Sequence, residues 1–144
     1  MVEEKKHSLI KPSVNSPISI DFDWWKKHDN NWRVYLHSCL CDEHQEQFSD
    51  LEEELLYDLI DMQTGEISKI DGLQHILISH CAKQENFITP NTTIVDTVFR
   101  LLIINGNRPM TSNELSDKIN RPAQTILRTL AGPRVYKGIR PIQQ

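Results

Sequence analysis

The sequence has few features of a membrane, secreted or disordered protein. None of its apolar runs approaches the roughly 18 residues of a membrane-spanning helix, and the N-terminal MVEEKKHSLI lacks the apolar segment of a signal peptide. Its three cysteines are an odd number, which fits a reducing compartment better than a disulfide framework. Since 25% of the residues are charged and 38% are hydrophobic, we expect a globular protein in the cytoplasm, with no membrane partner.

The motifs of common enzyme classes are also missing. The sequence contains no glycine-rich phosphate loop, no Gly-x-Ser-x-Gly nucleophile elbow and no His-Glu-x-x-His zinc motif. We also identify no basic residue placed beside a cysteine nucleophile. We therefore expect no catalytic residues, and a binding function rather than an enzyme.

Charge is divided unevenly along the chain. Residues 1–90 contain 8 Lys and Arg against 17 Asp and Glu, a net charge of −9, whereas residues 91–144 contain 8 against 3, a net charge of +5. Such asymmetry is typical of a protein in which one lobe faces a polyanion and the other faces solvent or a protein partner. The overall charge of −4 therefore does not exclude nucleic-acid binding.

The first part of the chain predicts a tail and a small α+β lobe. Residues 1–17 are polar and without a period, which predicts a disordered tail, and residues 18–88 predict an acidic lobe. Trp24 and Trp25 are expected to fold back onto the first helix of this lobe. The expected elements are a helix over 30–40, a connection at 41–47, a helix opened by the capping box Ser49-Asp-Leu-Glu52, a hairpin within 56–70 that turns at Gly65, and a helix over 71–84.

Cysteines and histidines gather at two places in the acidic lobe. Cys41 and His44 have a two-residue spacing in HSCLCDEH, and His80-Cys81 lie on the apolar face of the later helix. Two ligands from each place would form a tetrahedral zinc site that holds a small lobe together. The predicted ligands are Cys41, His44, His80 and Cys81, with His37, Cys39 and His75 as substitutes. The alternative is buried thiols with hydrogen-bonded histidines and no required cofactor, because adjacent residues of a helix point about 100° apart.

Residues 91–144 predict three short helices and an extended tail. The helices are expected over 92–105, 111–120 and 122–131. The first ends at Asn105-Gly106, the second opens with the capping box Thr111-Ser-Asn-Glu114, and the third starts at Arg121-Pro122. Two short helices joined by a tight turn and preceded by a longer one are typical of a helix-turn-helix.

The third helix has one apolar and one polar face. Ala123, Ile126, Leu127 and Leu130 are expected to pack inward. Because Arg pairs bidentately with guanine and Gln with adenine, the opposite face has the chemistry of direct base readout. Cations of the tail RVYKGIRPI, expected as a short strand or truncated wing, would contact phosphates and position the helix. The predicted DNA-binding residues are Arg121, Gln124, Thr125, Arg128, Arg134, Lys137 and Arg140.

The segment TSNELSDKINRPAQTILRTLAGPRVYKGIRPI resembles the winged helix-turn-helix superfamily of small DNA-binding domains. The resemblance covers about a third of the chain and implies that 122–131 is the recognition helix, followed by a wing. It departs from the family because a wing usually has two strands, and few residues follow Gly132. The fold expected is mainly α: a winged-helix-like tri-helical domain with a short terminal strand, beside the small α+β lobe.

Two functions follow from this resemblance. The first is a small transcriptional regulator or accessory factor that reads duplex DNA with the helix at 122–131. The alternative is a protein-docking module of a polymerase-associated, phage or plasmid complex, since winged helices also dock proteins and fold alone does not decide function. A protein partner could bind through the acidic lobe, and a homodimer is a further alternative, because DNA readers often pair to match a palindrome.

Overall fold

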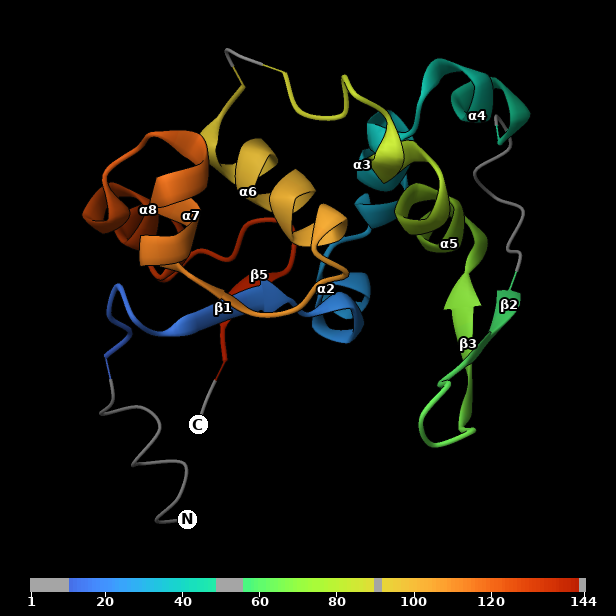
Figure 1. Ribbon diagram of the computed structural model, residues 1–144, viewed down its shortest axis with the longest axis horizontal. Coiled ribbons are helices and arrows are strands. Elements are labelled where there is room, and N and C mark those ends of the chain that lie inside the picture. The colour runs from blue at the N-terminus through green and yellow to red at the C-terminus, as the bar shows by residue number, and fades with distance from the viewer. Residues whose placement is uncertain (1–10, 49–55, 90–91, 143–144) are drawn as a thin grey trace. The chain divides into compact units, whose positions relative to one another are not determined.

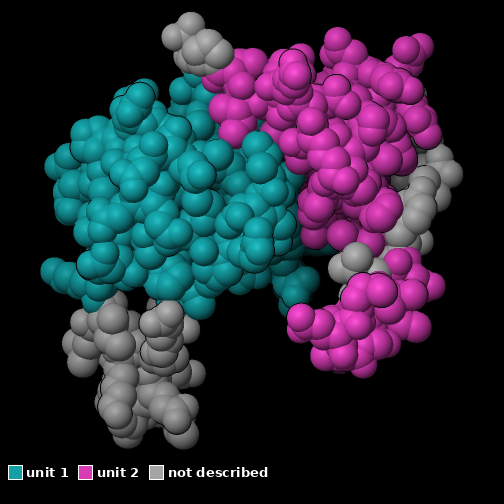
Figure 2. All heavy atoms as spheres, viewed as in Figure 1, with its two compact units in different colours: residues 1–28, 90–144 teal, residues 29–89 magenta. Residues whose placement is uncertain are grey.

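The computed structural model describes residues 11–48, 56–89 and 92–142 (Figure 1). These residues form a mainly helical fold, as the sequence predicts, with two antiparallel sheets. The chain divides into two compact units, coloured separately in Figure 2. Unit 1 comprises residues 1–28 and 90–144, and unit 2 comprises residues 29–89. No helix among the described residues has the length and apolar character to cross a bilayer.

Unit 1 combines a three-stranded antiparallel sheet with helices from both ends of the chain (Figure 1). Its elements are β1 (Pro17–Ile20), α2 (Phe22–His28), α6 (Ile94–Ile104), β4 (Met110–Thr111), α7 (Ser112–Ile119), α8 (Ala123–Leu130) and β5 (Ile139–Pro141). The strand order is β4-β1-β5, so the N-terminal strand lies at the centre of a sheet whose other strands come from the C-terminal part.

The division of the chain therefore differs from the boundary expected at 18–88. In β1, Ile18 pairs with Met110 on one side and Pro141 on the other, and Ile20 pairs with Ile139. Ile18 and Ile20 are buried, which places residues 17–20 in the core of unit 1 rather than in a tail or an acidic lobe. A four-residue strand gives no periodic signal of its partners, because these lie about 90 residues (β4) and about 120 residues (β5) further along the chain.

The tryptophans of α2 also belong to unit 1. Trp25 is buried and packs edge to face against Phe99 of α6, with ring centroids 5.6 Å apart, and Trp24 stacks on His28 at 4.2 Å. The tryptophan pair thus packs within unit 1, and its expected contact with the helix at 30–40 stays a prediction. The side chain of Asn107 bonds to both backbone groups of Ile20, at 2.9 and 2.8 Å, and ties the end of β1 to the loop after α6.

The three helices expected in the C-terminal part are confirmed. Thr93 caps α6 by accepting a hydrogen bond from the backbone of Asp96, and Thr111 and Glu114 form a reciprocal capping box on α7. Helix α7 ends at Asn120, which is left-handed at φ 58°. These helix ends were predictable because each capping interaction joins residues that lie within four positions of one another.

Unit 2 consists of a helical part and a hairpin that projects from it (Figure 1). Its elements are α3 (Trp32–Cys39), α4 (Asp42–Gln47), β2 (Leu56–Ile60), β3 (Ile67–Asp71), α5 (Gly72–Ser79) and the 3-10 helix η1 (Cys81–Lys83). The expected hairpin is confirmed, with Gly65 at φ 74°. The expected connection at 41–47 is instead the helix α4, and the expected helix at Ser49 lies outside the described residues.

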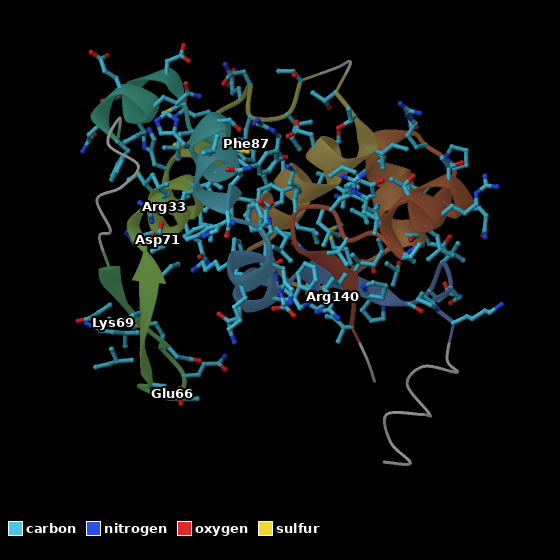
Figure 3. The ribbon with its side chains drawn as sticks, turned by 180° about the vertical axis from the view of Figure 1, so that it is seen from behind. Arg33, Glu66, Lys69, Asp71, Phe87 and Arg140 are labelled. Atoms are coloured by element: carbon cyan, nitrogen blue, oxygen red, sulfur yellow. The ribbon has the colours of Figure 1, made fainter. Side chains whose placement is uncertain are left out.

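An ion pair between a part-buried arginine and a buried aspartate joins α3 to the start of α5 in unit 2. Arg33 on α3 pairs with Asp71, whose side chain is 3% exposed, and both are labelled in Figure 3. Asp71 also caps α5, because its carboxylate accepts a hydrogen bond from the backbone of Leu73 at 2.9 Å. The helix expected from Asp71 to Gln84 is thus confirmed at its start, but α5 ends at Ser79.

Candidate functional sites

Helix α8 is held on α7 by a short, fixed turn. Asn120 adopts the left-handed conformation, and the hydroxyl of Ser116 donates a hydrogen bond to the carbonyl of Arg121 at 2.6 Å. Pro122 occupies the cap position of α8, one residue before the first helical residue. Its ring fixes φ, and it lacks the N–H that a helix start would leave unpaired. The turn therefore sets the direction of α8 without a long loop.

The two faces of α8 differ as the sequence predicts. Ile126, Leu127 and Leu130 are buried in unit 1. Of the predicted base-reading residues, Arg121, Gln124 and Arg128 are exposed and Thr125 is half-buried. No acidic residue lies in the first turn of α8. The exposed face thus carries two guanidinium groups and one amide on a rigid element.

The three predicted phosphate-contacting cations have different surroundings. Arg134 is exposed and lies over the ring of Tyr136, at 5.3 Å. Arg140, labelled in Figure 3, pairs with Asp21 at 3.5 Å and lies over the ring of Trp24 at 5.0 Å. Lys137 is half-buried. The charge of Arg140 is therefore partly neutralised within unit 1.

Lys137 lies in a tight turn where a wing was expected. Lys137 and Gly138 both have positive φ, at 54° and 73°, between the bridged residues Tyr136 and Ile139, which is the pattern of a two-residue hairpin turn. Gly138 accepts a hydrogen bond from the backbone of Asp21 at 2.8 Å. The expected terminal strand is present as β5, and the residues just before it form this turn, which is hydrogen-bonded to Asp21 next to the start of α2.

A different arrangement brings the predicted metal ligands together in unit 2. Ligand atoms of Cys41, His44 and His80 all lie within 4.8 Å of one another. Cys41 Sγ lies 3.1 Å from His44 Nδ1, and Cys81 Sγ lies 3.6 Å from Cys41 Sγ and 3.7 Å from His44 Nδ1. His44 and Cys81 are buried. The four residues chosen from the sequence thus form one cluster.

The substitute ligands lie in other surroundings. Cys39 is buried in α3, and Nε2 of His37 bonds to the carbonyl of Gln45 at 2.8 Å. His75 is half-buried on α5. Among the described residues, the potential ligand atoms that lie within 4.8 Å of one another belong to Cys41, His44 and His80 and to none of these three substitutes. Cys81 is outside that group of three as well, but its Sγ lies 3.6 Å from Cys41 Sγ and 3.7 Å from His44 Nδ1.

Local backbone structure explains why the cluster forms. Cys41 is the cap residue of α4, and the backbone N–H of His44 donates to the carbonyl of Cys41 at 3.0 Å, so one helical turn places both side chains. His80 leaves helical geometry, at φ −129° and ψ −60°, between α5 and η1. The expected 100° between neighbouring side chains of a helix therefore does not apply to His80 and Cys81.

Burial changes the acidity of the second thiol. Burial, together with the neighbouring Cys41 thiol, raises the pKa of Cys81 to about 11. In the absence of a cation the thiol is therefore protonated at neutral pH, which argues against a role as a reactive nucleophile.

The net charges of the two units are more sharply separated than those of the sequence halves. Unit 1 has 13 Lys and Arg against 7 Asp and Glu, a net charge of +6, and unit 2 has 3 against 13, a net charge of −10. In comparisons with known proteins, no family model matches the chain, and no curated protein or solved structure matches it at significant similarity.

Proposed function

We propose that unit 1 binds duplex DNA through α8, as a transcriptional regulator or an accessory DNA-binding factor. The observation that carries the proposal is the exposed set of Arg121, Gln124 and Arg128 opposite the buried face of the same helix. An α-helix fits the major groove of B-DNA, where arginine and glutamine side chains can distinguish base pairs. In this role α7 and α8 act as a helix-turn-helix, with α8 as the recognition helix.

The charge of unit 1 supports the same proposal. A net charge of +6 attracts the phosphate backbone, and contacts from Arg134 and Lys137 would orient α8 without reading sequence. Arg140 contributes less, since Asp21 already pairs with it. Unit 2, at −10, would be repelled by phosphates and is better suited to solvent or a protein partner.

A titration of a labelled duplex at about 50 and 200 mM salt tests this proposal. We expect binding that weakens steeply with salt, and a larger loss of affinity for Arg128→Ala than for Lys27→Ala. Lys27 is a matched control, because it is an exposed cation of α2 in the same unit. Absence of binding at the lower salt concentration would contradict DNA binding.

A protein-docking function is the second candidate. It is favoured by Ile104 and Ile142, two apolar residues of unit 1 that are 50% and 38% exposed. Exposed apolar side chains suit a protein surface better than a phosphate backbone. If the duplex does not bind at either salt concentration, this function is preferred.

A further inference from the structure

We propose that Cys41, His44, His80 and Cys81 bind one zinc ion that joins α4 to the junction of α5 and η1. This inference concerns unit 2 and is independent of DNA binding by unit 1. It rests on the separations of the four ligand atoms, on their placement by two short segments, and on the chemistry of the donors.

Three separations among the ligand atoms of Cys41, His44 and Cys81 are close to the edges of a zinc tetrahedron. With Zn–S near 2.3 Å and Zn–N near 2.05 Å, two sulfurs should lie about 3.8 Å apart and a sulfur and a nitrogen about 3.5 Å apart. The Sγ atoms of Cys41 and Cys81 are 3.6 Å apart, and His44 Nδ1 lies 3.1 and 3.7 Å from them. His80 supplies the fourth donor, within 4.8 Å of Cys41 and His44. Small adjustments of side chains would bring all four to one ion.

The donors come from segments that the backbone already fixes. Cys41 and His44 occupy the first turn of α4, and His80 and Cys81 follow the last turn of α5. The side-chain amide nitrogen of Gln84 lies 3.2 Å from Nε2 of His80. Turning this amide by 180° would place its oxygen there, where it would accept a hydrogen bond from Nε2–H and leave Nδ1 to take a metal. A partner on the second ring nitrogen is the usual arrangement for a metal-binding histidine.

The donor set selects zinc over other common ions. Two thiolates and two imidazoles in tetrahedral positions suit Zn²⁺, while Mg²⁺ and Ca²⁺ prefer oxygen ligands. Four protein donors leave no open position, so the site would be structural rather than catalytic. Binding releases the two thiol protons to solvent, with no change of oxidation state.

The ion would close a long loop in a small unit. Cys41 and Cys81 are 40 residues apart in sequence, and the segment between them contains the projecting hairpin. A unit of roughly 60 residues buries only a limited apolar core, and a structural metal is a common way of supplementing it. Zinc would therefore fix α4 against α5 and the positions of the elements between them.

Native mass spectrometry of the full chain, expressed without a histidine tag, tests the site. We expect one zinc per chain, lost after replacement of Cys41 by Ser and retained in Cys39→Ala, whose thiol is buried outside the cluster. The mass of the bare chain would overturn the proposal. So would a mass lower by two hydrogens, which would indicate a Cys41–Cys81 disulfide, or zinc retained in Cys41→Ser.

If Cys41→Ser does not fold, cobalt binding by the wild-type chain tests the same site. The wild-type chain is stripped with a chelator and titrated with Co²⁺ alone. Tetrahedral cobalt with two thiolates gives intense visible bands and a sulfur-to-cobalt charge-transfer band, saturating at one equivalent. Weak octahedral bands or the absence of saturation would overturn the proposal.

Discussion

Unit 1 has a net charge of +6 and a mainly apolar interior, whereas unit 2 has a net charge of −10 and buries a paired carboxylate and much of a cysteine–histidine cluster. In unit 1, Trp25, Phe99 and Ile126 are each at most 1% exposed. In unit 2, the polar residues Asp71 and His44 are buried, as are the apolar residues Leu73 and Leu77. The two units therefore depend on different interactions. Conditions that remove metal binding or the ion pair should affect unit 2 first, and conditions that disturb apolar packing in unit 1 should affect unit 1 first.

The largest expected effect comes from metal removal. Structural zinc contributes on the order of 10 kcal/mol in small peptides, so a chelator should destabilise unit 2 strongly and leave unit 1 unchanged. Calorimetry of the full chain is expected to show two transitions, of which only one moves to lower temperature with chelator. If the chelator shifts both transitions equally, or shifts neither, the two units do not differ in their dependence on a metal.

Asp71→Ala is expected to have the next largest effect. It removes the buried carboxylate that pairs with Arg33 and caps α5, which should lower the free energy of unfolding by about 2–4 kcal/mol. Asp58→Ala is the matched control, since Asp58 pairs with Lys69 on the hairpin and both are more than half exposed. That loss should be about 0–1 kcal/mol. Urea denaturation measures both, and similar losses would contradict the importance of the pair of Arg33 with Asp71.

Gly138→Ala should destabilise unit 1 by about 2–3 kcal/mol. An added Cβ would lie 2.7 Å from Cβ of Trp25, and the residue has a φ of 73°. Gly106→Ala has a similar φ of 68° with nothing within 4 Å of the added atom, so it should lose only about 1 kcal/mol. Thermal unfolding checks this prediction. Gly138→Ala should lower the temperature of the unit 1 transition, which is the transition that the chelator does not shift.

Lys137→Asn should have the smallest effect. It removes one cation from the turn, and asparagine tolerates the positive φ of this position. If Lys137 contacts a phosphate, the slope of log affinity against log salt should fall by about one unit, with similar changes for all duplexes. An unchanged slope would exclude the turn from the DNA contact.

The predictable parts of the fold were those with local signals. The capping box at Thr111, the positive φ of Gly65 and the apolar face of α8 depend on neighbours within a few residues. The position of β1 was not predictable in this way, because Ile18 and Ile20 gain their partners from the other end of the chain.

The members of the cysteine–histidine cluster were predictable by residue type but not by geometry. The sequence placed Cys41 and His44 at a suitable spacing, while a continuous helix through His80 and Cys81 argued against the site. The structure interrupts that helix at His80. The limited availability of Arg140 was also not predictable, because Asp21 reaches it only through the pairing of β1 with β5.

Selection of bound sequences from a random duplex pool tests most directly whether the exposed face of α8 reads DNA. The wild-type chain is expected to enrich a short motif, and Arg128→Ala should lose the preference for guanine at one position, at a cost of about 1–3 kcal/mol, while the other positions stay unchanged. No enriched motif, or the same motif with both proteins, would contradict the assignment of α8 as the recognition helix.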